Sequence, residues 1–188
     1  MQITDANKIK LIQLHDKYFV PFINAAAIEE AIARIAGEAA NDMAGETPVF
    51  IGVLNGAFMV VSDFVKQYKK PCEVSFVKLA SYEGTVSTEN VQELIGLNQN
   101  LEGRTVIVIE DIVDTGNTIA VLKDMFAAQK VKSLKFATLF FKPEAYTKDI
   151  PLDYIGFEIP NKFIVGYGLD YDGLGRNLPE IYQLQQNN

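Results

Sequence analysis

Two adjacent carboxylates and a short polar turn are the residues of this sequence best suited to chemistry. Glu110 and Asp111 follow the β-branched run Thr105–Ile109, and the turn Asp114-Thr115-Gly116-Asn117-Thr118 comes shortly after them. Carboxylates suit ribose hydroxyls or a hard divalent cation such as Mg²⁺. Small residues, hydroxyls and backbone N–H groups at the start of a helix suit a phosphate group, which the helix dipole also attracts. The stretch therefore indicates a site for a phosphate-bearing ligand.

The elements around these residues form a strand–loop–helix unit. Thr105–Ile109 has the pattern of a parallel strand buried on both faces, and Ile119, Leu122 and Phe126 recur at helical spacing from about Thr118. The loop then lies at the carboxyl end of the strand, where open α/β sheets bind ligands. On spacing alone, an ordinary helix with Asp114 or Thr115 as its N-cap explains the stretch equally well.

Other segments repeat this pattern, which predicts an α/β protein with a mostly parallel, twisted sheet flanked by helices. A second strand–loop–helix unit has the turn Asn55-Gly56-Ala57 between a strand and a helix. We expect helices over Ala25–Met43, capped by Asn24, and Phe58–Tyr68. We expect further strands over Pro48–Leu54, Cys72–Ala80, Gln92–Leu97, Ser133–Lys142 and Asp153–Ile159.

Composition excludes several classes of function. The chain has 188 residues, which suits one domain, and its net charge of −7 argues against a nucleic-acid partner. Cys72 and His15 are the only residues of their types, so intramolecular disulfides, cysteine metal clusters and histidine-rich zinc sites are excluded. Neither G-x-x-x-x-G-K-[ST] nor G-x-G-x-x-G occurs. With no signal-peptide or membrane-spanning pattern, we expect a cytoplasmic protein with no membrane partner.

The run E-D-I-V-D-T-G-N-T, preceded by V-I-V-I, resembles the phosphoribosyl pyrophosphate signature of type I phosphoribosyltransferases, in the form typical of the hypoxanthine–guanine branch. The resemblance extends over roughly 48–178. It implies the type I phosphoribosyltransferase fold in a single domain, 1–188. It also implies a small hood subdomain formed by the N-terminal arm and about 160–188.

Two further segments resemble loops of this family. G-V-L-N-G-A-F is similar to its pyrophosphate-binding loop, which implies that Asn55 and Gly56 bind pyrophosphate and that the Leu54–Asn55 bond is cis. Asn55 stands where many members have lysine, which removes one charge. V-K-L-A-S-Y-E-G-T resembles the catalytic lid, with Ser81 and Tyr82 at its base; by chemistry alone this segment reads as a surface loop.

The run F-E-I-P-N-K-F-I-V-G-Y-G-L-D-Y resembles the base-binding hood of the family. The resemblance implies that Phe163 stacks on the purine, that the backbone of Ile164 reads its edge, and that Asp170 helps to hold a metal. It also implies that Arg176 contacts pyrophosphate and that Lys142 contacts the exocyclic oxygen of the base. Taken alone, these residues read as core aromatics, a surface arginine and a solvated lysine.

The resemblance implies purine salvage. The enzyme would transfer 5-phosphoribose from phosphoribosyl pyrophosphate to hypoxanthine, guanine or both, giving IMP or GMP and pyrophosphate. Asp114 to Thr118 would hold the 5-phosphate, and Glu110 and Asp111 would bind the ribose directly or through Mg²⁺. Asp114 would also act as general base or acid on the purine. Thr115, Gly116 and Asn117 complete the phosphate loop, although relatives often have lysine at the Asn117 position.

The family resemblance also implies a homodimer or homotetramer. Two alternatives stay open: a sister transferase that prefers xanthine, and a regulator that senses phosphoribosyl pyrophosphate and binds nucleic acid. The acidic charge balance and the absence of spare sequence count against the regulator.

Overall fold

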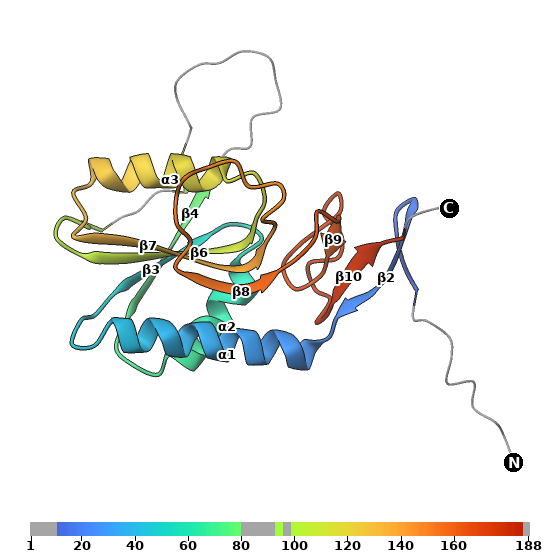
Figure 1. Ribbon diagram of the computed structural model, residues 1–188, viewed down its shortest axis with the longest axis horizontal. Coiled ribbons are helices and arrows are strands. Elements are labelled where there is room, and N and C mark those ends of the chain that lie inside the picture. Colours follow the sequence, from blue (N-terminus) through green and yellow to red (C-terminus); the bar gives the residue numbers. More distant parts are fainter. Residues whose placement is uncertain (1–10, 80–92, 96–98, 186–188) are drawn as a thin grey trace, which may run out of the picture.

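The computed structural model describes residues 11–79, 93–95 and 99–185, which form two β-sheets and three helices within those ranges (Figure 1). The strands of the main sheet are β3 (Val49–Val53), β4 (Glu73–Leu79), β5 (Glu93–Ile95), β6 (Thr105–Val113), β7 (Ser133–Phe141) and β8 (Tyr154–Glu158). Their order in the sheet is β5-β4-β3-β6-β7-β8. All pair in parallel except β5, which is antiparallel to β4. The predicted α/β class is therefore confirmed.

Three helices cover the two faces of the main sheet. α1 (Ala25–Asp42) and α2 (Phe58–Tyr68) lie on one face, and α3 (Asn117–Ala128) lies on the other (Figure 1). The β-branched run of β6 serves both faces, because alternate residues point to opposite sides. Ile107 and Ile109 belong to the core beneath α1 and α2, whereas Val106 and Val108 pack in the core beneath α3.

The start of α1 follows the sequence signal closely. The Asn24 side chain accepts a hydrogen bond from the Ala27 N–H at 2.9 Å, which satisfies one of the free donors of the first turn. Ile28, Ile32 and Ile35 then recur on one face and are buried. Among the described residues, no helix is both long and apolar enough to cross a membrane.

A second, antiparallel sheet joins the two ends of the described chain. It consists of β1 (Ile12–Leu14), β2 (Lys17–Ile23), β9 (Ile164–Val165) and β10 (Ile181–Leu184), in the order β1-β2-β10-β9. Figure 1 places this sheet beyond the carboxyl ends of the main strands, beside β8. The described part of the N-terminal arm, from residue 11 on, contains the β-hairpin of β1 and β2, and the sheet forms the hood-like part expected of the fold.

The largest difference from the sequence expectation lies at the carboxylate pair. The strand predicted to end at Ile109 continues to Val113, because Glu110 to Val113 stay paired with β7 as far as Phe141. The next helix begins at Asn117 with Gly116 as its N-cap and no side-chain capping bond. The alternative with Asp114 or Thr115 as N-cap is therefore wrong. Other predicted boundaries agree with the observed ones to within two residues, and those of α2 agree at both ends.

Candidate active site

Glu110 and Asp111 occupy the carboxyl half of β6, in the middle of the main sheet. Glu110 is buried, and this burial raises the pKa of its carboxyl group well above the ordinary value, with a further rise from the charge of Asp111. Burial also raises the pKa of Asp111, although the Ile112 N–H donates to its Oδ1 at 2.9 Å and Arg176 is nearby. The protein therefore compensates this carboxylate pair only in part, which suits hydroxyl donors or a cation.

The turn after β6 surrounds a small polar hollow at the start of α3. The hollow has a volume of about 100 Å³ and is lined by Glu110 and by residues 112–119. Gly116 adopts a φ of +83°, and a Cβ atom there would lie 2.4 Å from the Tyr146 ring, so the turn requires glycine. The first-turn N–H groups of α3 lack a side-chain cap, and such a helix start attracts an anion.

Asp114 and Lys142 meet at the ends of the neighbouring strands β6 and β7. The Lys142 Nζ lies 2.9 Å from Asp114 Oδ2, and the Lys142 side chain is 9% exposed whereas that of Asp114 is 44% exposed. The Lys142 N–H also donates to the Val113 carbonyl at 3.0 Å, which fixes the end of β7 against β6. Lys142 is thus a buried, paired residue, and the alternative of a solvated lysine is wrong.

The loop after β3 approaches the carboxylate pair directly. The Leu54–Asn55 peptide bond is cis, as predicted. Asn55 is exposed, and Gly56 lies so close to Asp111 that an added Cβ atom would come within 1.6 Å of the Asp111 Oδ2. Only glycine fits at this contact, which joins two of the segments assigned from the sequence.

The hood brings Arg176 and Asp170 to the same place. Arg176 Nη2 lies 2.7 Å from Asp170 Oδ1, and its Nη1 donates to the Gly168 carbonyl at 2.6 Å. Gly168 packs on the loop after β3, since a Cβ atom there would lie 2.1 Å from the Gly56 carbonyl oxygen. Arg176 is half-buried and paired, so it is not a solvated surface arginine.

Phe163 is an exposed ring within an aromatic group rather than a core residue. It is 46% exposed and immediately precedes the hood strand β9 (Ile164–Val165). Its ring centroid is 5.9 Å from that of Tyr171, nearly perpendicular to it, and 6.3 Å from that of Phe19. The following residue, Ile164, is buried and pairs with Gln183 of β10. The arrangement leaves an aromatic face for a planar ligand.

The structure joins four of the predicted segments but does not form a closed metal cage. Within 11–79, 93–95 and 99–185, no group of three or more His, Cys, Asp or Glu side chains could hold a metal ion. Mg²⁺ commonly keeps several waters and binds through one or two carboxylates together with substrate phosphates. The oxygen donors of Glu110, Asp111 and Asp170 suit a magnesium ion that enters with its substrate. The predicted lid residues Ser81 and Tyr82 lie outside the described residues.

Sequence reasoning missed the segment that covers the phosphate loop from the side of β7. The Thr147 N–H and Oγ1 donate to the Thr115 carbonyl at 3.3 and 3.2 Å. The Lys148 side chain lies against Gly116, where an added Cβ atom would be 2.8 Å from its Cγ. These residues lie in an irregular segment after Lys142, and neither periodicity nor a motif indicates their contact with the loop.

Comparison with known proteins identifies relatives along most of the chain. A model of the phosphoribosyl transferase domain matches residues 23–172. The hypoxanthine-guanine phosphoribosyltransferase of Streptococcus thermophilus (strain CNRZ 1066) is 46% identical over 146 residues, which cover 77% of this chain and 81% of the relative. That of Streptococcus mutans serotype c is 40% identical over 163 residues, covering 85% and 91%.

The fold is also similar to solved structures of such enzymes. A hypoxanthine-guanine phosphoribosyltransferase from Bacillus anthracis superposes with a TM-score of 0.83 at 38% identity, covering 88% of this chain and 98% of that one. A hypoxanthine phosphoribosyltransferase from Staphylococcus aureus superposes with a TM-score of 0.82 at 36% identity, covering 88% and 90%.

Proposed function

This chain belongs to the hypoxanthine-guanine phosphoribosyltransferases, and from that premise we propose that it transfers 5-phosphoribose from phosphoribosyl pyrophosphate to hypoxanthine or guanine. The products are IMP or GMP and pyrophosphate, which makes the reaction one of purine salvage. The observation that carries the proposal is the meeting of three separate segments. Asp111 lies against Gly56, and Gly56 lies against Gly168 beside Arg176.

Each part of the donor substrate has a complementary group in this assembly. The hollow formed by Asp114 to Thr118 would hold the 5-phosphate through N–H groups and hydroxyls. Glu110 and Asp111 would accept hydrogen bonds from the ribose hydroxyls, which would relieve the raised pKa values of this pair. Asn55, Gly56 and Arg176 would bind pyrophosphate, to which a guanidinium offers planar paired donors.

The base would lie between Phe163 and the Asp114–Lys142 pair. The ring of Phe163 would stack on the purine, and the backbone of Ile164 would contact its edge. Lys142 has only donors, so it favours the exocyclic oxygen of a 6-oxopurine over the amino group of adenine. Asp114 would exchange a proton with the imidazole nitrogen of the purine as the bond to the ribose forms or breaks.

Mg²⁺ fits the donors of this site, and Glu110, Asp111 and Asp170 would hold it together with the substrate. Bound there, the ion supplies positive charge that stabilises the departing pyrophosphate. The chain itself orients the ribose between its carboxylates and its phosphate loop, which fixes the geometry of the reacting carbon. Closure by the segment that includes Ser81 and Tyr82 would exclude water from the reaction.

We also propose a single cytoplasmic domain that includes the hood and assembles as a homodimer or homotetramer. Membership of the family supports this assembly. Light scattering coupled to size-exclusion chromatography measures this directly, and a monomer at micromolar concentration would contradict it.

The reaction is tested by supplying phosphoribosyl pyrophosphate and Mg²⁺ with hypoxanthine, guanine, xanthine or adenine in separate assays. We expect turnover of hypoxanthine or guanine that is abolished by EDTA. Dominant turnover of xanthine would replace the proposal by the sister transferase. Binding of phosphoribosyl pyrophosphate without turnover of any base, together with a salt-dependent gel shift of nucleic acid, would replace it by a regulator.

A further inference from the structure

We propose that Tyr167, through its hydrogen bond to Asp63, is a positioning residue that holds the pyrophosphate end of the active site together. The inference rests on the proposed function, since it assigns a role to two residues outside the groups that would touch the substrates. Neither residue stands out in the sequence as a candidate for chemistry. The contact joins the hood to α2, two parts of the fold that are 104 residues apart in the chain.

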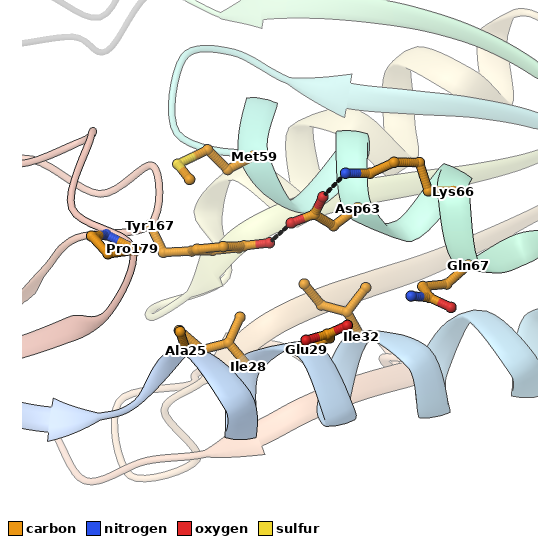
Figure 2. Close-up of a pocket in the computed structure, with 10 residues that line it drawn as sticks. All are labelled: Ala25, Ile28, Glu29, Ile32, Met59, Asp63, Lys66, Gln67, Tyr167 and Pro179. Carbon is orange, nitrogen blue, oxygen red and sulfur yellow. Dashed lines mark hydrogen bonds and ion pairs between the residues drawn. The ribbon is translucent and has the colours of Figure 1, made fainter.

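The contact is a buried tyrosine hydroxyl facing a carboxylate. Tyr167 is 6% exposed, and its ring reaches from the hood toward α2, where the hydroxyl donates to Asp63 (Figure 2). Asp63 also forms an ion pair with Lys66, three residues further along α2. Two donors therefore satisfy the Asp63 carboxylate.

The hydrogen bond lies at the wall of a pocket, since both Tyr167 and Asp63 line it. The pocket has a volume of about 410 Å³ and is lined by residues of α1, α2 and the hood. Ile28, Ile32 and Met59 form part of its apolar wall, and Tyr167 also lines it, with its hydroxyl toward Asp63 of α2 (Figure 2). Tyr167 belongs to the buried core, but the pocket leaves part of its surroundings without close packing, so the polar contact helps to fix the distance between hood and helix.

The two ends of the contact continue directly into the pyrophosphate groups. On the hood, Tyr167 precedes Gly168, whose carbonyl accepts from Arg176 and whose Cα packs on the Gly56 carbonyl. On the other side, α2 begins at Phe58, immediately after the Asn55-Gly56-Ala57 loop. The Tyr167–Asp63 bond thus joins the helix that follows the loop to the turn of the hood that packs on that loop. Release of this bond would let Gly168 and Arg176 shift away from Gly56.

The ionisation of the two groups agrees with a permanent bond. Burial and the hydrogen bond to Asp63 raise the pKa of Tyr167, so its hydroxyl remains a donor at neutral pH. Burial acts to raise the pKa of Asp63, but the bonds from Lys66 and Tyr167 outweigh it and lower the pKa. Asp63 is therefore a charged acceptor, and hydrogen bonds to charged groups are stronger than neutral ones.

The test is Tyr167→Phe, which removes the hydroxyl and keeps the ring. We expect kcat/KM for phosphoribosyl pyrophosphate to fall about tenfold, as for the loss of one such hydrogen bond. At saturating phosphoribosyl pyrophosphate, kcat/KM for hypoxanthine should change less than about twofold, because the pairing of β9 with β10, which does not involve the Tyr167 hydroxyl, holds the hood residues beside the base. Isothermal titration calorimetry with Mg²⁺ and pyrophosphate should show the same loss of affinity without turnover.

The acceptor is tested by a pair of variants at Asp63. Asp63→Asn keeps an oxygen that can accept from Tyr167, so it should retain more affinity for pyrophosphate than Asp63→Ala. In the double variant Tyr167→Phe/Asp63→Ala, the two losses should be far from additive, since both remove one bond. Additive losses would overturn the proposed coupling.

The matched control is Tyr154→Phe. The Tyr154 hydroxyl donates to Asp42 Oδ2 at 2.9 Å, and Tyr154 is equally buried, but it begins β8 at the end of the sheet opposite to the active site. This variant should lower the unfolding midpoint and leave both kcat/KM values unchanged.

Three results separate the possibilities. If Tyr167→Phe behaves like Tyr154→Phe, with lower stability and unchanged pyrophosphate affinity, the role of Tyr167 is structural only and the inference is wrong. If the unaltered protein transfers phosphoribose to no base, the proposed function fails by itself. If the unaltered protein is active and Tyr167→Phe changes both substrates equally, the specific link to pyrophosphate fails while the proposed function stands.

Discussion

The Glu110–Asp111 pair and Asp63 are two carboxylate sites near the Asn55-Gly56-Ala57 loop. They differ in how far the protein itself compensates the negative charge. Glu110 and Asp111 lie next to each other in β6, and burial raises the pKa of both. Asp63 lies on α2, where hydrogen bonds from Lys66 and Tyr167 lower its pKa despite burial. The fold therefore leaves the charge of Glu110 and Asp111 only partly compensated, whereas it supplies Asp63 with hydrogen-bond donors and a positive charge.

This difference shows which group is built for a ligand. A buried pair of like charges destabilises a folded protein unless a partner supplies compensating donors or positive charge. Ribose hydroxyls with Mg²⁺ would supply that compensation at Glu110 and Asp111. Substrate binding should therefore offset the cost of desolvation and like-charge repulsion that this pair imposes on the folded protein. Asp63 has its partners within the chain, so its role is to hold parts of the chain in place.

The largest effect on activity is expected from Asp114→Asn. Asp114 is paired with Lys142 and half-exposed at the mouth of the site. If it serves as general acid or base, the variant should lose about 10²–10⁴ in turnover. Single-turnover kinetics measure the chemical step, and circular dichroism controls for folding. Turnover near that of the unaltered protein would remove Asp114 from the mechanism.

Gly56→Ala should disturb the loop that contacts Asp111 and precedes the helix of Asp63. An added Cβ atom would come within 1.6 Å of Asp111 Oδ2, so Asp111 or the loop must move. A displacement of about 1 Å at a reacting geometry costs about 10²-fold in rate, and we expect a loss of that size in kcat/KM.

Gly37→Ala is the matched control, because Gly37 lies inside α1 and an added Cβ atom there would meet no atom within 4 Å. This variant should stabilise the protein by about 1 kcal/mol through helix propensity, with unchanged activity. Activity equal to that of the unaltered protein in Gly56→Ala would show that Asp111 does not need its observed place.

Glu110→Gln should separate activity from stability. The variant removes one of the two buried charges and keeps the shape of the side chain. We expect kcat/KM for phosphoribosyl pyrophosphate to fall about 10- to 100-fold, because a hydrogen bond to a charged group is lost. The midpoint of denaturant unfolding near neutral pH should rise, since the buried charge no longer has to be desolvated. A lower midpoint would mean that Glu110 is already compensated in the free protein.

The sequence predicts the local structure around Glu110 and Asp111 but not their contacts with distant segments. The strand–loop–helix pattern around Glu110 depends on neighbours in the chain, so periodicity and turn residues predict it. The sequence predicts the end of this strand too early, because two adjacent carboxylates suggest a loop, whereas pairing with β7 keeps them in a strand. Hydrogen bonding to a neighbouring strand is a tertiary effect that no local pattern records.

Contacts between segments that are distant in sequence are visible only in the structure. Gly56 against Asp111, Gly168 against Gly56, and Tyr167 with Asp63 all join residues far apart in sequence. The family resemblance identifies the loops that contain Gly56 and Gly168. It assigns no role to α2, whose residues have the pattern of an ordinary amphipathic helix. Asp63 therefore looked like any polar residue on an exposed helix face.

The smallest expected effect is on the pH dependence of stability, where Glu110 and Asp63 should act in opposite directions. The folded pKa of Glu110 lies above its unfolded value, so the folded state binds more protons between the two, and stability falls as pH rises from about 4.3. The folded pKa of Asp63 lies below its unfolded value, so its contribution is present above about pH 3.9 and is lost as pH falls.

Denaturant midpoints of the unaltered protein, Glu110→Gln and Asp63→Asn between about pH 3 and pH 8 measure both effects. The difference between unaltered protein and Glu110→Gln should fall with rising pH, because only the unaltered protein acquires the buried charge. The difference between unaltered protein and Asp63→Asn should rise with pH in the acidic range, because the bonds to the carboxylate form as it ionises. Two difference curves with the same slope would contradict the distinction, since both carboxylates would then be compensated, or left uncompensated, in the same way.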